Sequence, residues 1–275
     1  MRTLYVSDLD GTLLNNKAEL SASATADLNT LINQGLNFTY ATGRSWMGAS
    51  KAMKNVNLNL PVITYNGAFV SEPATGKVIR AFSISADKAE SMLTVLRTHD
   101  VYPLVYTFID SIERILWIKG EETDEIRDFL ERRQRDKRLM GVDSWNDLAK
   151  ESIHQLLVVG SHSKLTPIAA MLENKVGYCV IFSKDYYADQ YLLEIYDEQV
   201  SKAAGIEWLC DNYGFDKVIC FGDNVNDISM FEASDEAYAP NNALPEVKLI
   251  ADGIIGSDED GAVVEFIKNY IKSNI

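Results

Sequence analysis

Two aspartates near the start of the chain, Asp8 and Asp10, directly follow a short apolar run. Residues 4–6 are typical of a buried strand, and side chains two residues apart on an extended segment point the same way. Both carboxylates therefore converge at the end of the strand, where Gly11 lets the chain turn away. Carboxylates this close repel each other unless a cation lies between them. The stretch predicts either a Mg²⁺ site with one carboxylate free to attack, or a simple surface turn after a strand.

A hydroxyl and a glycine, Thr42-Gly43, follow the second expected strand at residues 37–41. A new helix is expected to begin directly after them. Backbone N–H groups at a strand-to-helix turn bind anions, and the hydroxyl adds a further donor. The alternative interpretation is an ordinary capped helix start with a tight glycine turn.

A later apolar run at 216–221 leads into the segment 222–227, Gly-Asp-Asn-Val-Asn-Asp. This segment brings Asp223, Asn226 and Asp227 to another strand-to-helix turn, and Lys202 stands at the start of the preceding expected helix. Simpler interpretations exist for each residue. Asp223 suits a turn, Asp227 suits a helix N-cap, and Lys202 suits a solvated surface.

These motifs share one edge of the molecule if the strands before them form a parallel sheet, because the carboxyl ends of parallel strands meet there. Together they offer carboxylates for a metal, donors for an anion and one ammonium group, which phosphoryl transfer needs. In this hypothesis Asp8 attacks phosphorus and carries an aspartyl-phosphate, and Asp10 protonates the leaving oxygen and later activates water. Asp223 completes the metal shell with Asp8, and Lys202 neutralises charge on Asp8 and the phosphate.

The order of elements predicts an α/β fold, with a Rossmann-like parallel-sheet core interrupted by an inserted α+β domain. Residues 1–82 and 198–275 form the expected core, which includes a hairpin at 68–82, and residues 83–197 form the expected insertion. The expected strands are 4–6, 37–41, 61–65, 68–70, 78–82, 102–109, 114–119, 154–159, 178–183, 191–196, 216–221, 236–239 and 250–255, and the main expected helices are 21–34, 86–98, 123–137, 165–173, 201–213 and 261–272.

The chain has 275 residues and a net charge of −14 at pH 7. This charge argues against nucleic acid or anionic membrane as a partner, because those bind basic surfaces, but it is compatible with a small phosphorylated metabolite held by local donors. No apolar run approaches the roughly 20 residues of a membrane span. The three cysteines and the three histidines do not show the spacing of metal ligands. The expected strand at 4–6 lies so close to Met1 that we expect no signal peptide. A reducing cytoplasm fits best.

The motif set resembles the haloacid dehalogenase superfamily of phosphatases. More narrowly, it resembles the Cof-type subfamily, which has a large α/β cap of the C2B type inserted after the third core strand. The matching motifs are residues 8–14, Thr42-Gly43-Arg44, Lys202 and residues 222–230, together with residues 65–68 and 258–261. The resemblance spans the whole chain. One departure is Ala203, where the family often has a glycine after the lysine.

The resemblance implies that Asp8 is the nucleophile and a Mg²⁺ ligand. Asp10 is implied to be the general acid/base and to offer its backbone carbonyl to the metal. Asp223 is the third implied protein ligand, and Asp227 supports the metal through water or fixes Lys202. The implied phosphate-binding groups are Thr42, the N–H groups of Leu9 and Gly43, Lys202 and Asn226.

The resemblance also assigns the choice of substrate to the cap, and it implies sugar phosphates and similar small phosphomonoesters. Arg44 and residues 185–190 are candidates for contact with the leaving group. Two other functions stay open: a phosphomutase on the same scaffold, and a non-catalytic regulator that binds a phosphorylated metabolite. The sequence is compatible with a monomer or a homodimer.

Overall fold

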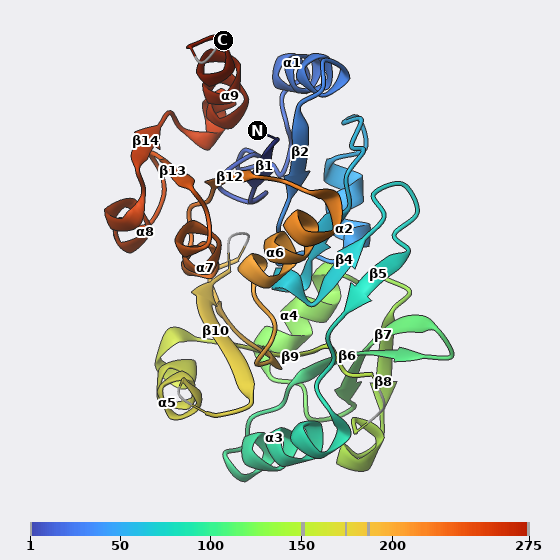
Figure 1. The fold of residues 1–275 in the computed structure, drawn as a ribbon. Helices are drawn as coiled ribbons and strands as arrows, with labels where there is room; N and C mark the ends of the chain where they lie inside the picture. Colours follow the sequence, from blue (N-terminus) through green and yellow to red (C-terminus); the bar gives the residue numbers. More distant parts are fainter. Residues whose placement is uncertain (1, 150–151, 174, 186–187, 274–275) are drawn as a thin grey trace. The chain divides into compact units, whose positions relative to one another are not determined.

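The structure is a computed structural model, in which residues 2–149, 152–173, 175–185 and 188–273 are described. The chain divides into two compact units (Figure 1). Met1–Ala81 and Val200–Ile275 form the core unit, and Phe82–Gln199 form the inserted unit. Each unit has its own sheet and its own hydrophobic core.

A five-stranded sheet of order β14-β13-β12-β1-β2 lies at the centre of the core unit, and every neighbouring pair in it is parallel. Its strands are β1 (Thr3–Ser7), β2 (Asn37–Tyr40), β12 (Lys217–Phe221), β13 (Glu236–Pro240) and β14 (Gly253–Ile255). The helices of this unit are α1 (Ala22–Asn33), α2 (Trp46–Ala52), α6 (Lys202–Tyr213), α7 (Ile228–Glu232), α8 (Pro245–Ile250) and α9 (Ala262–Ser273).

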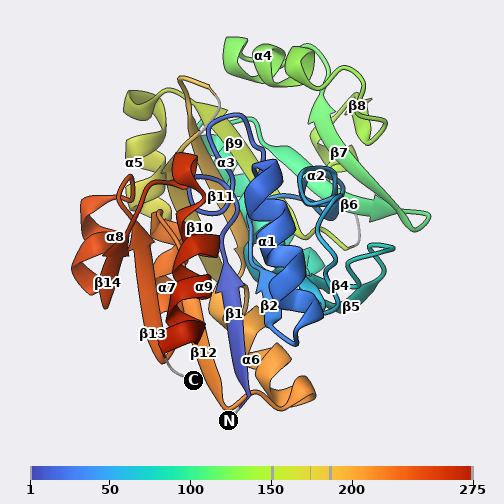
Figure 2. The ribbon, with the colours of Figure 1, turned by 90° about the horizontal axis from the view of Figure 1, so that it is seen from above.

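Helices cover both faces of this sheet, because alternate side chains of β1 point to opposite sides. Tyr5 packs in one hydrophobic cluster with residues of α1 and α9, and Figure 2 shows these two helices over the same face. Leu4 and Val6 pack in a second cluster with residues of α6, α7 and α8. Strand β1 is therefore buried from both sides, which holds the residues that follow it in place.

Three short strands of the core unit, β3 (Val62–Thr64), β4 (Phe69–Ser71) and β5 (Val78–Ala81), form a separate antiparallel sheet. The hairpin predicted at 68–82 is confirmed by the β4–β5 pairing. The third expected strand joins the parallel sheet through a single bridge, between Ala41 and Ile63, because its backbone pairs with β4.

The inserted unit contains a six-stranded sheet of order β10-β11-β9-β6-β7-β8, which is antiparallel except for the β7–β8 pair. Its strands are β6 (Leu104–Ile109), β7 (Ile112–Ile118), β8 (Leu139–Val142), β9 (Gln155–Gly160), β10 (Tyr178–Lys184) and β11 (Tyr191–Asp197). Its helices are α3 (Ala86–Thr98), α4 (Asp124–Arg132) and α5 (His162–Leu172). Buried side chains of α3 and α5 share one hydrophobic cluster with alternate residues of the sheet.

The charged helix expected at 123–137 is shorter in the structure, where α4 ends at Arg132. The following residues form a turn in which the Arg138 guanidinium bonds to Asp136, and Leu139–Val142 then pair with β7. The prediction of one long helix was wrong because the Lys137 carbonyl accepts from Arg114 Nη1 of β7 at 2.8 Å, a partner that helical spacing does not reveal.

The strand expected at 250–255 covers only Gly253–Ile255. Pro245 occupies the first turn of α8, a helix that the sequence pattern did not predict and that runs to Ile250. Proline is favoured at this position because the N–H that it lacks has no partner inside the helix. The predicted fold class, a parallel-sheet core with helices and a separate α+β insertion, is confirmed.

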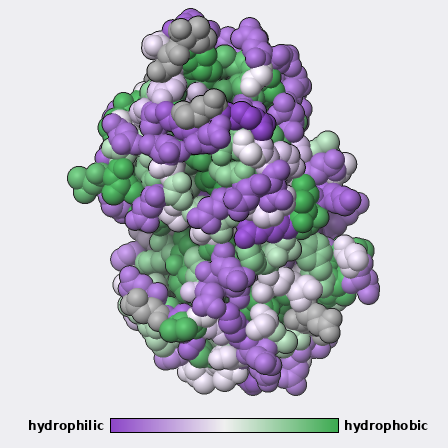
Figure 3. Space-filling view, in the orientation of Figure 1, coloured by the Kyte–Doolittle hydropathy of each residue, from purple (hydrophilic) through white to green (hydrophobic). Residues whose placement is uncertain are grey.

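Hydrophilic and hydrophobic residues are interspersed on the face drawn in Figure 3. Within the described residues, no helix is both long and apolar enough to cross a bilayer. Cys179, Cys210 and Cys220 are all described, and each is a free thiol.

Candidate active site

The strands of the core sheet bring the sequence-predicted polar residues to one edge. Ser7, the last residue of β1, pairs with Phe221 at the end of β12 and with Tyr40 at the end of β2. The three strands therefore end level with one another. Asp8 follows the end of β1, and Asp223 follows the end of β12. The backbone N–H of Asp8 donates to the carbonyl of Phe221 at 2.8 Å.

Asp8, Asp223 and Asp227 form a buried cluster in which one carboxylate oxygen from each lies within 4.8 Å of the others. Lys202 opens α6 because Ser201 caps that helix, with its hydroxyl accepting from the N–H of Ala204 at 3.0 Å. The Lys202 ammonium lies 2.7 Å from Asp8 Oδ1 and 2.6 Å from Asp227 Oδ1. Three carboxylates thus face one ammonium group, which leaves negative charge uncompensated.

The pKa values of Asp8, Asp223 and Lys202 reflect this uncompensated negative charge. Burial raises the pKa of Asp8 to about 7, the ammonium of Lys202 opposes this shift, and the carboxylate of Asp227 adds to it. Burial also raises the pKa of Asp223 well above its usual value, with contributions from the carboxylates of Asp227 and Asp8. Burial works against the charged form of Lys202, but the two carboxylates that it touches outweigh burial and raise the pKa of the lysine.

Asp227 organises the loop that follows β12. Its Oδ2 accepts from the backbone N–H groups of Asp223 at 2.9 Å and of Asn224 at 3.0 Å, while its Oδ1 accepts from Lys202. A Cβ atom on Gly222 would lie only 2.5 Å from the Asp227 carboxyl carbon, so this position needs glycine. Asp227 therefore holds both Lys202 and the Asp223 backbone in place, and its contact with a metal stays a prediction.

Thr12 is a site residue that the sequence reasoning did not single out. Its buried hydroxyl donates to Asp223 Oδ1 at 2.9 Å, across 211 residues of sequence. This bond orients the Asp223 carboxylate toward the end of β1. A polar residue buried directly after the Asp-x-Asp-Gly turn was the available signal, but its partner was not predictable.

Asp10 lies outside the buried carboxylate cluster. Its carboxylate forms a two-point ion pair with Arg44, in which Arg44 Nε donates to Oδ2 at 2.6 Å and Nη2 donates to Oδ1. Both side chains are about one-fifth exposed. The sequence predicted both residues for the site but did not predict this pair, and it placed the Asp10 side chain beside that of Asp8.

The predicted phosphate-binding residues occupy the same edge of the core sheet. Thr42 is buried after β2, and its hydroxyl oxygen accepts from the N–H of Arg44 at 3.2 Å. Asn226 Nδ2 donates to Asn66 Oδ1 at 2.9 Å, and the Asn66 amide also lies against Gly43. Leu9 is buried in the turn that joins Asp8 to Asp10. Asn66 is thus a second residue of this site that was not assigned a role from the sequence.

Residues 185–190, proposed from the sequence for leaving-group contact, belong to the inserted unit. Gln190 Nε2 donates to Asp185 Oδ2 at 2.7 Å. Tyr186 and Tyr187 lie outside the described residues.

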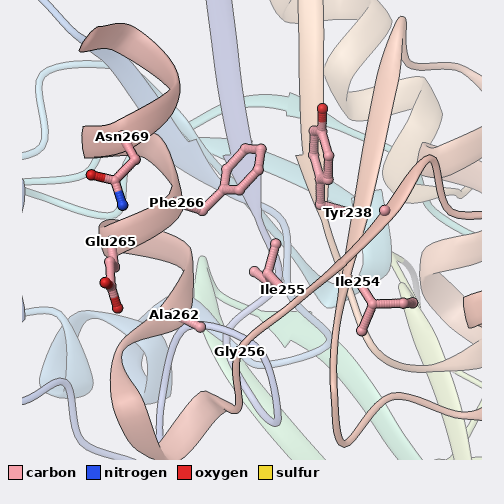
Figure 4. A pocket seen from close by; sticks show the side chains of 9 residues that line it. Tyr238, Ile254, Ile255, Gly256, Ala262, Glu265, Phe266 and Asn269 are labelled. Carbon is pink, nitrogen blue, oxygen red and sulfur yellow. The ribbon is translucent and has the colours of Figure 1, made fainter. Parts of the chain in front are cut away.

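A hollow of about 350 Å³ occurs elsewhere in the core unit, between α9 and the strands β13 and β14 (Figure 4). Tyr238, Ile255 and Phe266 line it, with Glu265 and Asn269. None of the sequence-predicted site residues lines this hollow, so it is separate from the carboxylate cluster.

Comparison with known proteins gives consistent results along the whole chain. A family model described as haloacid dehalogenase-like hydrolase matches residues 5–267. The 5-amino-6-(5-phospho-D-ribitylamino)uracil phosphatase of Bacillus subtilis is 25% identical over 276 residues, which cover 97% of each chain. The HMP-PP phosphatase of Yersinia pestis (strain Pestoides F) is 25% identical over 288 residues, which cover 99% of this chain and 97% of the relative.

The fold also matches a solved structure, a haloacid dehalogenase-like hydrolase from B. subtilis. The two superpose with a TM-score of 0.79 at 22% identity, over 98% of this chain and 99% of the other. This likeness concerns the fold, and it covers both units.

Proposed function

Because this chain belongs to the haloacid dehalogenase-like hydrolase family, we propose that it hydrolyses small phosphomonoesters with Mg²⁺, through an aspartyl-phosphate on Asp8. The observation that carries this proposal is the contact between Asp8 and Lys202 inside a buried cluster that holds two more carboxylates. A nucleophilic carboxylate approaching a phosphate dianion needs positive charge beside both groups. The cluster offers one ammonium and a set of oxygen ligands for a second cation.

The residues fit Mg²⁺, which prefers oxygen ligands. Burying three carboxylates against one ammonium is unfavourable unless protons or a cation compensate the charge. The raised pKa values of Asp8 and Asp223 are a consequence of this burial and of the neighbouring carboxylates. Asp8, Asp223 and the backbone carbonyl of Asp10 would hold the ion, with Asp227 acting directly or through water. When bound, Mg²⁺ would neutralise charge on the nucleophile and the phosphoryl oxygens.

The chemistry proceeds in two displacements at phosphorus. A carboxylate oxygen of Asp8 forms a bond to phosphorus as the ester P–O bond breaks, and Asp10 gives its proton to the leaving alcohol oxygen. Asp10, now ionised, takes a proton from water as that water attacks phosphorus. The bond to Asp8 breaks, inorganic phosphate leaves, and both aspartates return to their starting states.

The phosphoryl oxygens are held by groups of the core unit. Lys202 contributes a positive charge close to Asp8, and Thr42 contributes a hydroxyl at the end of β2. The N–H groups of Leu9 and Gly43 and the Asn226 amide complete the proposed set. Hydrogen-bond donors fixed before the reaction stabilise the developing charge without reorganisation.

Proton donation by Asp10 requires a change at its ion pair with Arg44. Both carboxylate oxygens of Asp10 accept from Arg44, so at least one of these contacts opens before Asp10 reaches the leaving oxygen. In this proposal the Arg44 guanidinium then contacts the leaving group or the phosphate. The position of Arg44 beside Asp10 supports the sequence prediction that Arg44 contacts the leaving group.

We assign the choice of leaving group to the inserted unit, residues 83–197 in the sequence prediction. Small sugar phosphates and related esters are the proposed substrates. The B. subtilis relative supports this class, because its name specifies a phosphoribityl compound as substrate. A reducing cytoplasm and a monomer or homodimer stay predictions.

The proposal is tested by release of inorganic phosphate from p-nitrophenyl phosphate and from a panel of sugar phosphates, with Mg²⁺ and with EDTA. We expect turnover that requires Mg²⁺ and that is lost in Asp8→Asn. A phosphomutase would instead return the phosphoryl group to a second position of the sugar and release little phosphate. A non-catalytic regulator would bind the esters without turnover, and either result would contradict the proposal.

A further inference from the structure

Three consecutive residues between β3 and β4 adopt left-handed backbone conformations. The φ angles are 49° at Tyr65, 54° at Asn66 and 105° at Gly67. Glycine adopts positive φ freely and asparagine tolerates it, but a tyrosine at such a φ is uncommon. Strained turns persist only where the surrounding structure holds them, and they cluster at functional sites. The contacts of this turn therefore indicate its function.

The backbone of the turn binds the segment that follows β2. The N–H of Tyr65 donates to the carbonyl of Arg44 at 3.0 Å, and the N–H of Asn66 donates to the carbonyl of Thr42 at 2.9 Å. The turn thereby fixes the segment from Thr42 to Arg44, which includes the hydroxyl and the N–H proposed to bind phosphate.

The glycine of the turn packs against the start of the helix that carries Lys202. A Cβ atom on Gly67 would lie 2.0 Å from the carbonyl oxygen of Ser201, a distance that no side chain allows. Ser201 is the N-cap of α6. One short turn therefore contacts both the Thr42–Arg44 segment and the start of α6.

The Asn66 side chain adds a third contact, to the loop after β12. It is buried, its Oδ1 accepts from Asn226 Nδ2 at 2.9 Å, and its amide lies 3.3 Å from where a Cβ on Gly43 would be. An amide nitrogen carries two hydrogens in one plane. With one hydrogen bonded to Asn66, the plane of the Asn226 amide is set and its second hydrogen has a defined direction.

We infer that Asn66 is a positioning residue of the phosphate site, which orients the Asn226 amide and holds Gly43 beside it. This inference rests on the proposed function. An asparagine at this position has two explanations: tolerance of a positive φ, or a need for the side-chain oxygen. Tolerance of positive φ alone would be satisfied equally by glycine, whereas positioning requires the side-chain oxygen.

The substitution Asn66→Gly separates these reasons, because glycine keeps the backbone conformation and removes only the amide. Its matched control is Asp100→Gly, an exposed residue of the inserted unit that has the same φ of 54°. The readouts are kcat/KM for p-nitrophenyl phosphate with Mg²⁺, the Kd of inorganic phosphate by calorimetry, and Tm. Asn226→Ala and the double variant Asn66→Gly/Asn226→Ala complete a thermodynamic cycle.

For Asn66→Gly we expect kcat/KM to fall by about 10- to 100-fold and phosphate binding to weaken, because a misplaced donor is costly even when the fold is intact. The Tm should fall by only about 2–4 °C, because one buried hydrogen bond is lost. The loss in the double variant should be clearly smaller than the product of the two single losses, since both changes remove the bond between Asn66 and Asn226. Asp100→Gly should match wild type in all three readouts. Wild-type activity of Asn66→Gly, or losses that multiply in the double variant, would overturn the inference.

Asn66→Asp provides a second test, which also covers a poorly folding glycine variant. The carboxylate keeps an acceptor for Asn226 but places negative charge near the phosphate. We therefore expect kcat to stay close to wild type while KM rises. An equal loss of kcat in Asn66→Asp and Asn66→Gly would contradict the positioning role.

Failure of the proposed function leaves a different signature. If wild type binds inorganic phosphate but releases none from any ester, the hydrolase proposal is wrong, and weaker phosphate binding by Asn66→Gly still supports positioning. If wild type binds no phosphate, with or without Mg²⁺, both proposals are overturned.

Discussion

The core unit and the inserted unit each hold a cluster of charged side chains, and the two clusters differ in how their charges are balanced. In the core unit, Asp8, Asp223 and Asp227 face the single ammonium of Lys202. In the inserted unit, Arg138 donates to Asp136 at 2.7 Å and to Glu113 at 2.9 Å, and Glu113 also lies 3.4 Å from His154 Nε2. Each carboxylate of the inserted unit's cluster thus has a cationic or neutral partner of its own.

The pKa shifts of the two clusters run in opposite directions. Burial opposes ionisation of Asp136, but hydrogen bonds and charge from Arg138 outweigh it and lower the pKa of that carboxyl. For Asp8 and Asp223, burial and neighbouring carboxylates raise the pKa. A cluster whose members stabilise one another's charges supports the fold, whereas a cluster whose members oppose one another needs a ligand. Four predictions test this distinction.

The largest expected effect comes from changing one carboxylate to an amide in each cluster. Asp8→Asn removes the proposed nucleophile, so phosphatase activity should fall by at least about 10⁴-fold. The same change relieves repulsion between buried carboxylates, so the Tm measured in EDTA should stay equal or rise. Steady-state kinetics and calorimetry on the same sample measure both.

The matched variant of the inserted unit is Asp136→Asn, which should lose stability and keep its activity. Loss of the charged hydrogen bonds to Arg138 should lower the free energy of unfolding by about 1–2 kcal/mol, with kcat/KM unchanged. If Asp136→Asn removed activity and left stability intact, the two clusters would not differ as stated.

The next largest effect concerns Asp10, whose pair with Arg44 is balanced in the same way as the pairs of the inserted unit, although its proposed role is catalytic. Asp10→Asn should slow hydrolysis of sugar phosphates by about 10²- to 10⁴-fold, because their alcohols need a proton to leave. Hydrolysis of p-nitrophenyl phosphate should fall much less, because nitrophenolate leaves without one. Equal losses for both substrates would mean that the pair is only structural.

Addition of Mg²⁺ should stabilise one unit and not the other. A ligand present at 100 times its Kd stabilises the folded state by about 2.7 kcal/mol. Hydrogen exchange should show this gain at amides of β1 and β12, and not at amides of β6 and β9. Asp223→Asn serves as the control, because it removes a proposed ligand and should abolish the gain. Stabilisation of both units alike would argue against a site confined to the core cluster.

The smallest effect is expected from His154 in the inserted unit. Burial lowers its pKa from 6.5 despite the neighbouring Glu113, so the folded state favours the neutral imidazole. Stability is then complete above pH 6.5 and decreases as the pH falls below it, because the unfolded chain takes up the proton first. Hydrogen exchange at β9 between about pH 5 and pH 8 measures this loss.

His154→Phe should remove the pH dependence at β9, and the exposed His162→Gln should retain it. A wild-type profile that stays flat across this range would show that the histidine is not part of a pH-sensitive cluster. The sequence spacing assigned none of the three histidines a ligand role, and the structure shows that the side chain of His154 is buried.

Much of the fold followed from local patterns. The strands expected at 4–6 and 216–221 and the helices expected at 21–34 and 201–213 correspond to β1, β12, α1 and α6. The misses occurred where the chain bonds to distant segments. Strand β8 pairs with β7, and just beyond the end of α4 the Lys137 carbonyl accepts from Arg114 of β7 at 2.8 Å.

The sequence by itself determined the fold class, the family and the placement of acidic, hydroxyl and amide residues at strand ends, because each of these depends on a few neighbouring residues. Only the tertiary structure decided which atoms meet. Asp8 and Asp10 are two residues apart, yet one contacts Lys202, 194 residues away, and the other contacts Arg44. Strand register and the left-handed turn at Asn66 set these pairings, and both arise from packing between segments distant in sequence.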